Sequence, residues 1–184
     1  MLALIDARAV FDSKDKSQKT PLHCAAEVGN SEALQMLLNA NATVDIKDVL
    51  ENTALHDASQ GGHDAAVQVL LSVHTNLDVE NEGGLSPLYC AANKGHRAAV
   101  QLLADARANV NFPNRYNRTP LHQAAAHGFP AVVQALIEAR AAINAKDDMN
   151  WTPLHCAADE GDTACLQLLV DANATVDGKD DDRQ

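Results

Sequence analysis

Histidine and cysteine side chains lie side by side at several points of this 184-residue chain, and such pairs could bind a metal ion or support nucleophilic catalysis. The residues concerned are His23, His56, His122, His155, Cys24, Cys90, Cys156 and Cys165. A structural zinc site needs four ligands that converge at about 2.0–2.3 Å from the ion. The histidines are spread along the chain, and no ligand spacing matches a zinc pattern. The sequence therefore predicts a structural role for them and no bound metal.

Other catalytic patterns are missing from the sequence. It has no glycine-rich phosphate loop, no arrangement of serine, histidine and aspartate typical of a hydrolase, and no paired carboxylates in a plausible pocket. The acidic run 180–182 is typical of a solvated segment rather than of a metal site. We therefore predict that the chain is not an enzyme and that it uses no cofactor.

Each of the four histidines belongs to a seven-residue motif that returns at a fixed interval. The copies TPLHCAA, TALHDAS, SPLYCAA, TPLHQAA and TPLHCAA begin at Thr20, Thr53, Ser86, Thr119 and Thr152. Each copy starts 33 residues after the previous one, without an insertion. A period of this length indicates stacked supersecondary units rather than a fold around one central core. We number the repeats one to five and predict a single elongated domain over residues 1–184, with a partial repeat at 1–19.

The elements that carry the motif can be predicted from its residue types. Threonine followed by proline favours a helix start, and a glycine nine residues after the start, as at Gly29 and Gly128, favours the end of that helix. A second apolar stretch follows, for example Leu34, Leu37 and Leu38, with the spacing of one helical stripe. Each repeat is thus predicted to be a helix, a turn, a second helix and an extended finger.

The motif and its period resemble the ankyrin-repeat family. The resemblance implies an all-α solenoid of helix-turn-helix units with β-hairpin-like fingers. It also implies that the motif histidine bonds to backbone between units, and that a protein partner binds the fingers and the concave face of the inner helices. Some family members are hydroxylated on a finger asparagine, and Asn111 and Asn144 hold the matching position.

A site can be predicted from the positions that contact partners in this family. The partner-binding residues expected here are Leu85, Arg115, Tyr116, Arg118, His127, Met149 and Trp151. Tyrosine, tryptophan and arginine are enriched at binding hot spots, which favours this set. An alternative for Trp151 is that its ring covers its own finger.

Two other functions stay open at this point. The chain could be the targeting segment of a larger multidomain enzyme or channel, or a structural spacer within a longer array, in contact with further ankyrin repeats of the same chain. The motif of repeat five is the same as that of interior repeats, which favours a piece of a longer array.

Charge and composition limit the classes of partner and the cellular compartment that we expect. The net charge of −11 disfavours nucleic acid and anionic membrane surfaces. No stretch resembles a membrane span or a signal peptide, and the cysteines are predicted to be reduced thiols, so an intracellular location, cytoplasmic or nuclear, is expected.

Two departures from the family pattern predict backbone strain. Where the family has glycine after the second helix, this chain has Asn41, His74, Arg107, Arg140 and Asn173. Glu51 likewise replaces a usual finger glycine. A left-handed backbone is unfavourable for arginine, histidine and glutamate, so these positions are expected to be strained.

Overall fold

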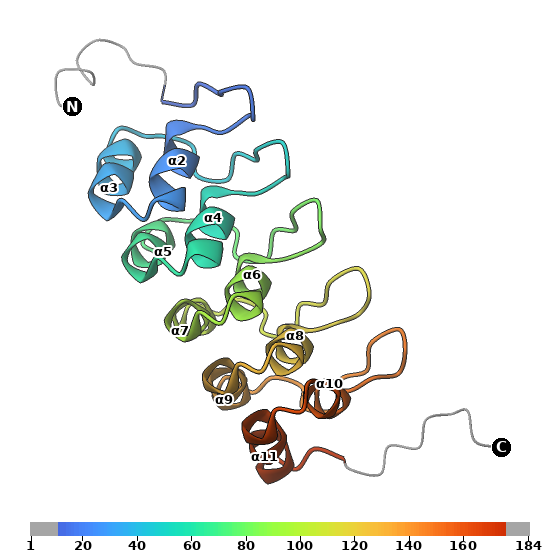
Figure 1. Ribbon diagram of the computed structural model, residues 1–184. Helices are drawn as coiled ribbons and strands as arrows, with labels where there is room; N and C mark the ends of the chain where they lie inside the picture. The colour runs from blue at the N-terminus through green and yellow to red at the C-terminus, as the bar shows by residue number, and fades with distance from the viewer. Residues whose placement is uncertain (1–10, 176–184) are drawn as a thin grey trace.

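The computed structural model describes residues 11–175, and these form five pairs of antiparallel helices stacked in one row (Figure 1). The inner helices, nearest the fingers, are α2 (Pro21–Glu27), α4 (Ala54–Gly61), α6 (Pro87–Asn93), α8 (Pro120–Ala126) and α10 (Pro153–Glu160). The outer helices are α3 (Ser31–Asn39), α5 (Asp64–Leu71), α7 (Arg97–Asp105), α9 (Pro130–Glu138) and α11 (Thr163–Asp171). The predicted all-α solenoid is confirmed. The first ten residues of the predicted partial repeat, and 180–182, lie outside the described part.

Each inner helix begins and ends where the motif predicts. Thr20 has an extended backbone at the N-cap of α2, and it forms a capping box with His23. Pro21 starts the helix with a φ that already suits it. Beyond the end of α2, Gly29 turns the chain with a φ of +70°, and the glycines at the same phase of the other repeats also have positive φ.

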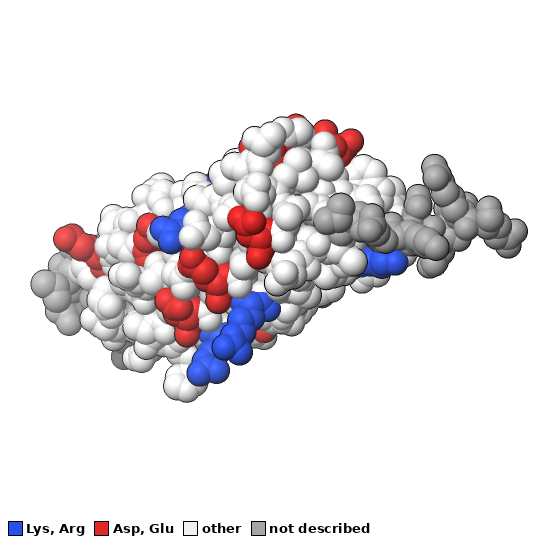
Figure 2. Space-filling view, turned by 90° about the horizontal axis from the view of Figure 1, so that it is seen from below, with Lys and Arg blue, Asp and Glu red and all other residues white. Residues whose placement is uncertain are grey.

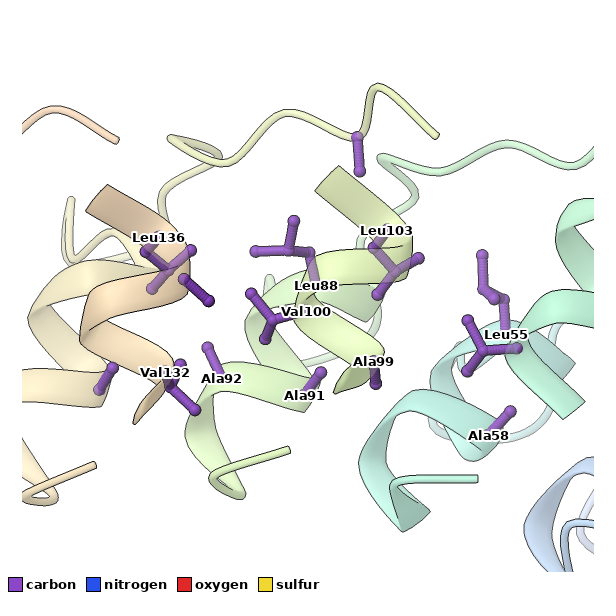
Figure 3. Close-up of a cluster of buried hydrophobic side chains, with 14 of the residues drawn as sticks. Leu55, Ala58, Leu88, Ala91, Ala92, Ala99, Val100, Leu103, Val132 and Leu136 are labelled. Atoms are coloured by element: carbon purple, nitrogen blue, oxygen red, sulfur yellow. The ribbon is translucent and has the colours of Figure 1, made fainter. Parts of the chain in front are cut away.

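Leucine and alanine side chains fill the space between successive helix pairs (Figure 3). Leu55, Leu88 and Leu121 occupy the same motif position, and none of the three has exposed surface. Burial of a leucine side chain stabilises a fold by about 1.5–3 kcal/mol. Alanines such as Ala58 and Ala91 are also fully buried, and their small size lets neighbouring helices approach closely.

The fingers are hairpin-like turns, and no strand occurs within residues 11–175. In the finger before repeat two, the N–H of Asp48 donates to the Asn52 carbonyl at 2.9 Å. The Asp48 Oδ1 accepts the N–H groups of Leu50 and Asn52 at 2.9 and 2.8 Å. The Asp48 carboxylate thus accepts two amides of the finger, and together with the Asp48–Asn52 backbone bond this closes the finger as a turn.

The predicted left-handed positions are present with one exception. Arg107 and Arg140 have φ values of +75° and +64°, and Glu51 has +59°. His74 is not in the left-handed region, so that prediction was wrong. The helix α5 ends early, with Ser72 as a right-handed C-cap, and the β-branched Val73 follows where other repeats have alanine.

A recurring glutamine lies on the exposed side of the outer helices. Its amide donates to the side chain four residues later in four repeats: Gln35 to Asn39, Gln101 to Asp105, Gln134 to Glu138 and Gln167 to Asp171, at 2.8–3.1 Å. Pairs of this spacing stabilise a helix by about 0.2–0.5 kcal/mol each, so the glutamine has a local structural role.

Candidate protein-binding surface

The fingers all project to the same side of the stack, next to the inner helices (Figure 1). Backbone hydrogen bonds join neighbouring finger tips: the N–H of Val49 donates to Ser17 O at 3.0 Å, and that of Asp148 donates to Tyr116 O at 3.2 Å. These bonds hold neighbouring finger tips side by side, so that residues of different repeats lie along one edge of the stack.

The motif histidines connect one repeat to the next. The N–H of Thr20 donates to His23 Nδ1 at 3.2 Å, which makes Nδ1 an acceptor and leaves the proton on Nε2. That Nε2–H donates to Asn52 O at 3.0 Å. His56 and His122 repeat this pattern. The prediction of backbone bonds between units is confirmed for these three histidines.

Burial lowers the pKa of these three histidines and raises the pKa of the buried thiols of Cys90, Cys156 and Cys165. Loss of hydration lowers the pKa of His56 to about 4, and it raises the pKa of Cys90 to about 12. All four cysteines are free thiols, and Cys156 and Cys165 are buried as expected. Within residues 11–175 no group of three or more His, Cys, Asp and Glu side chains could hold a metal ion. The three histidines thus take part in hydrogen bonds between repeats, and Cys90, Cys156 and Cys165 are packed in the interior.

Two of the predicted partner-binding residues stand out as exposed apolar side chains. Tyr116 is 69% exposed and Met149 is 61% exposed. Both line a hollow of about 350 Å³ at the fingers before repeats four and five. The other lining residues are Asn114, Arg118, Gln123, Asp147 and Asp148.

Arg118 lies in the same hollow but is already paired. Its Nε donates to Asp147 Oδ2 at 3.0 Å, and Asp147 is buried. Burial opposes the charge on Asp147, yet hydrogen bonds from Trp151, Arg118 and Met149 hold its pKa below the usual range. Arg118 therefore fixes the finger before repeat five through its ion pair with a buried carboxylate.

The remaining predicted residues lie in different surroundings. Trp151 and Leu85 are half-buried, and the Trp151 ring packs against the core at 6.3 Å from the His155 ring. His127 is exposed and lies edge-on to Phe129. Arg115 is exposed in a second hollow, lined also by Leu50, Gln60 and Glu82. The structure thus brings Tyr116, Met149 and Arg118 together and places Leu85, Arg115, His127 and Trp151 outside their hollow.

Arg115 also explains a glycine in the preceding finger. Gly84 has a φ of +72°, and an added Cβ there would lie 2.7 Å from the Cγ of Arg115. Any side chain at this position would therefore disturb the contact between two finger tips.

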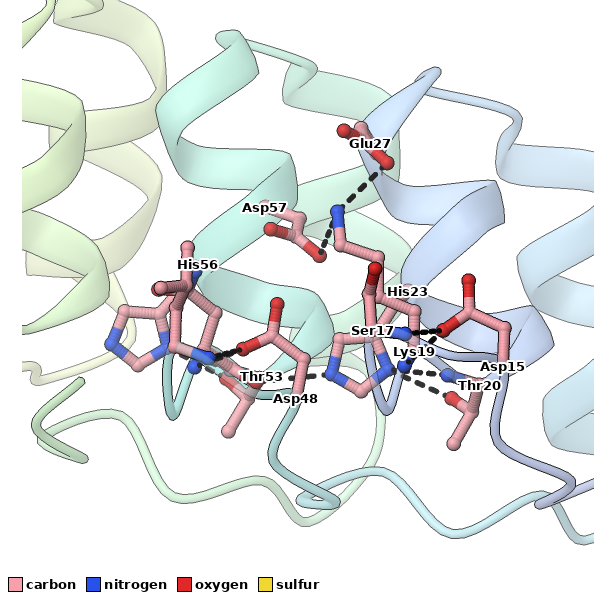
Figure 4. Close-up of polar contacts among 12 residues, drawn as sticks. Asp15, Ser17, Lys19, Thr20, His23, Glu27, Asp48, Thr53, His56 and Asp57 are labelled. Atoms are coloured by element: carbon pink, nitrogen blue, oxygen red, sulfur yellow. Dashed lines mark hydrogen bonds and ion pairs between the residues drawn. The ribbon is translucent and has the colours of Figure 1, made fainter. Parts of the chain in front are cut away.

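A third hollow, of about 370 Å³, lies between the inner helices α2 and α4 and includes residues that sequence reasoning missed. Lys19 Nζ lies 2.8 Å from Glu27 Oε2 and 3.8 Å from Asp57 Oδ2 (Figure 4). Asp48 and the half-exposed Leu50 also line it. The sequence did hold one sign of this hollow: Asp57 is a carboxylate at a motif position where the other repeats have cysteine or glutamine.

Burial makes the Asp57 carboxyl group a weaker acid than an exposed one. Loss of hydration raises its pKa to about 7, against the attraction of Lys19, and the nearby Asp48 and Glu27 carboxylates raise it further. This carboxylate therefore changes its charge near neutral pH.

Charged side chains of both signs lie close together on the face shown in Figure 2. Acidic side chains lie over much of this face, in keeping with the net charge of −11, and the basic ones gather in a few places beside them. Helices long and apolar enough to cross a membrane are absent from residues 11–175.

The two asparagines at the position hydroxylated in some ankyrin proteins have structural partners. Asn111 Oδ1 accepts the N–H of Ala142 at 2.7 Å, and Asn144 Oδ1 accepts that of Thr175 at 2.9 Å. Asp12 and Asp78 make the same bond to the next finger. The shared role at this position is therefore a link between successive fingers.

Comparison with known proteins identifies the family. A search of curated proteins gave no match. The family model described as ankyrin repeats (3 copies) matches residues 1–81, 55–147 and 108–180, which together span nearly the whole chain. Repeats of this kind are in general protein–protein interaction modules. With its 33-residue period, paired helices and inter-repeat histidine bonds, the chain belongs to the ankyrin-repeat family.

Proposed function

We propose that this protein is a non-catalytic binding module whose protein partner lies across the finger tips and inner helices of repeats three to five. The observation that carries this proposal is the pair Tyr116 and Met149, two large apolar side chains that are mostly exposed and line one hollow. Exposed tyrosine and methionine beside a hollow are typical of binding surfaces.

The backbone that carries these two residues is held in place before any partner arrives. The N–H of Tyr116 donates to Asn114 Oδ1 at 2.9 Å, and the N–H of Met149 donates to Asp147 Oδ1 at 2.9 Å. A preorganised surface loses less conformational entropy on binding, which favours affinity. Arg115 and His127, both exposed, lie at the edges of this region and are proposed as peripheral contacts.

We further propose an intracellular location, because the cysteines are free thiols and one of them, Cys24, is exposed. A targeting role within a larger enzyme or channel is compatible with this surface, since targeting also requires a bound protein. A purely structural spacer would not depend on Tyr116 or Met149.

Affinity capture on the immobilised full chain, followed by mass spectrometry, would identify the partner, and titration of the purified partner would test the surface. Tyr116→Ala is expected to weaken binding by about 2 kcal/mol or more, which is roughly thirtyfold, because a central aromatic contact is lost. Met149→Ala is expected to act in the same direction.

Val170→Ala is the matched control. Val170 is also an exposed apolar residue, at 44%, but it lies on the outer helix α11. Its substitution should leave affinity unchanged. Equal affinities for the Tyr116 and Met149 variants and the parent protein, with folding intact by circular dichroism, would refute this surface.

A further inference from the structure

Three buried polar side-chain atoms in residues 11–175 have no hydrogen-bond partner, and all three belong to α4 or to the finger that leads into it. They are Asp48 Oδ2, Asp57 Oδ2 and Ser59 Oγ. An unsatisfied buried polar group destabilises a fold by about 1–3 kcal/mol. Among the described repeats, unsatisfied groups of this kind thus occur only at repeat two.

The two carboxylates line the same hollow. Asp48 is 6% exposed, and the side chain of Asp57 is 9% exposed. Figure 4 shows their carboxylates directed into the space between α4 and the finger, on the side of Lys19. Two buried carboxylates with free oxygens in one hollow form an acceptor for a positively charged group.

Another repeat of the same chain shows which group fills such an acceptor. Arg118 stands directly before Thr119, and its guanidinium bonds to Asp147, 29 residues later, at 3.0 Å. Lys19 stands directly before Thr20, and the residue 29 positions later is Asp48. The Lys19 ammonium instead contacts Glu27 and Asp57, so the Asp48 oxygen stays without a partner.

The second carboxylate is particular to this repeat. Asp57 occupies the motif position held by Cys24, Cys90, Gln123 and Cys156 in the other repeats. A carboxylate is not needed to fill this position, because cysteine or glutamine occupies it in the other repeats.

We propose that this hollow binds the guanidinium group of an arginine side chain from the protein partner, between Asp48 and Asp57. The proposal rests on the proposed function, since it extends the partner's contact area toward repeat two. A guanidinium presents several N–H donors in one plane and can serve both carboxylates at once, whereas an ammonium is a single point charge. Leu50 is 52% exposed at the rim and offers an apolar contact for the arginine stem.

Lys19 must move aside for the guanidinium to enter, and its contacts allow this. Its shortest ion pair is with Glu27, whose side chain is 58% exposed. The Lys19 side chain is 20% exposed, and a pair whose acidic partner is exposed in this way stabilises by only about 0–1 kcal/mol. The contact with Asp57 is longer, at 3.8 Å, and the incoming guanidinium would replace its positive charge. The hollow of about 370 Å³ is large enough for the arginine head group and part of its stem.

The test is a titration of the ¹⁵N-labelled full chain with the capped tripeptide Ala-Arg-Ala, followed by amide NMR shifts at pH 8. Saturable shifts are expected for Asn52, Asp57 and Gln60. The same tripeptide with citrulline in place of arginine, which keeps the shape but loses the charge, should bind at least tenfold more weakly. Binding should also weaken at pH 5.5, where Asp57 is protonated.

Two variants with the same change in charge separate the hollow from general attraction. Asp57→Gln introduces the residue that repeat four has at this position. It should weaken binding of the arginine peptide at least tenfold. Asp64→Asn, on the exposed start of the outer helix α5, should leave binding unchanged.

The absence of saturable shifts, or equal shifts with citrulline or in Asp57→Gln, would overturn the proposal. A lysine peptide that binds as tightly as the arginine peptide would overturn the choice of guanidinium. If this test fails while Tyr116→Ala still weakens the captured partner, only the arginine assignment is lost and the proposed function stands.

Discussion

Single residues decide how each repeat is joined to the next. His56 accepts the N–H of Thr53 and donates to Leu85 O, so one ring caps a helix and ties down the following finger. Tyr89 replaces the histidine in repeat three and bonds instead to Gln123, at 2.9 Å, and to Asn114. The motif position holds a polar ring in both repeats, and the two ring types contact different neighbours.

The pKa of Asp57 predicts an unusual dependence of stability on pH. Its pKa is about 7 in the folded protein and 3.8 as the ordinary value. Between these values the folded state holds a proton that the unfolded state has released. Stability from this group is therefore full below pH 4, falls as pH rises to about 7, and stays constant above that. The neighbouring charged groups are Lys19, Glu27 and Asp48, with Lys94 at the hollow and the Cys90 thiol on α6.

Asp57→Gln should remove this dependence. We expect the variant to be more stable than the parent, and the gain in unfolding free energy to be about 2–3 kcal/mol larger at pH 8 than at pH 5. Urea denaturation at both pH values measures this. His23, His56 and His122 have lowered pKa values and act in the opposite direction, losing stability as pH falls below about 6.5, but they are the same in both proteins and cancel in the difference. A gain that is equal at the two pH values would contradict the raised pKa of Asp57.

At the scale of the helices, the ends carry the strain. Arg107 follows α7 with a φ of +75°, which is unfavourable for any residue with a Cβ. The exposed arginine has no ion pair within 4 Å among the described residues. The left-handed backbone is therefore the main strain that a change to glycine would relieve.

Arg107→Gly should stabilise the protein by about 0.5 kcal/mol, because relief of the left-handed strain exceeds the extra entropy that glycine gives the unfolded chain. His74→Gly is the matched control at the same phase of repeat two. His74 is not left-handed, so this change should not stabilise. Chemical denaturation of both variants decides the matter, and a loss of stability in Arg107→Gly would show that the arginine makes a contact worth more than the strain.

At the scale of the whole molecule, the stack has no single centre. The main contacts join each helix to the other helix of its pair and to its counterpart in the next pair. Stability is therefore expected to be close to a sum of repeat and interface contributions.

Substitution of one interior leucine should affect the repeats on both sides of it. Leu88→Ala in repeat three removes a fully buried side chain between two neighbours, and we expect a loss of about 2–5 kcal/mol. Leu154→Ala in repeat five should cost less, because Leu154 keeps 9% of its surface exposed. Hydrogen exchange should show faster opening of α4 and α8 in Leu88→Ala. Faster exchange confined to α6 would contradict this coupling.

The fold and most element ends could be read from the sequence, because they depend on local chemistry repeated five times. Threonine, proline and glycine set the helix ends through their own backbone preferences, and Arg107 and Arg140 were correctly expected to be left-handed. The same expectation for His74 was wrong, because α5 ends early and the left-handed turn is lost with it.

The surface was decided by tertiary structure. Tyr116 and Trp151 both lie in fingers, but Tyr116 points to solvent while Trp151 packs against the core. Arg118 bonds to Asp147, whereas Lys19, at the same position of another repeat, turns to Glu27 and leaves Asp48 without a partner. The repeated sequence determined which position of a helix or finger each residue occupies. Its exposure and its partner were decided by the folded surroundings. Arg118 reaches Asp147, 29 positions away, because the repeats stack, whereas Lys19 turns to Glu27, eight positions away, and to Asp57 of the next repeat.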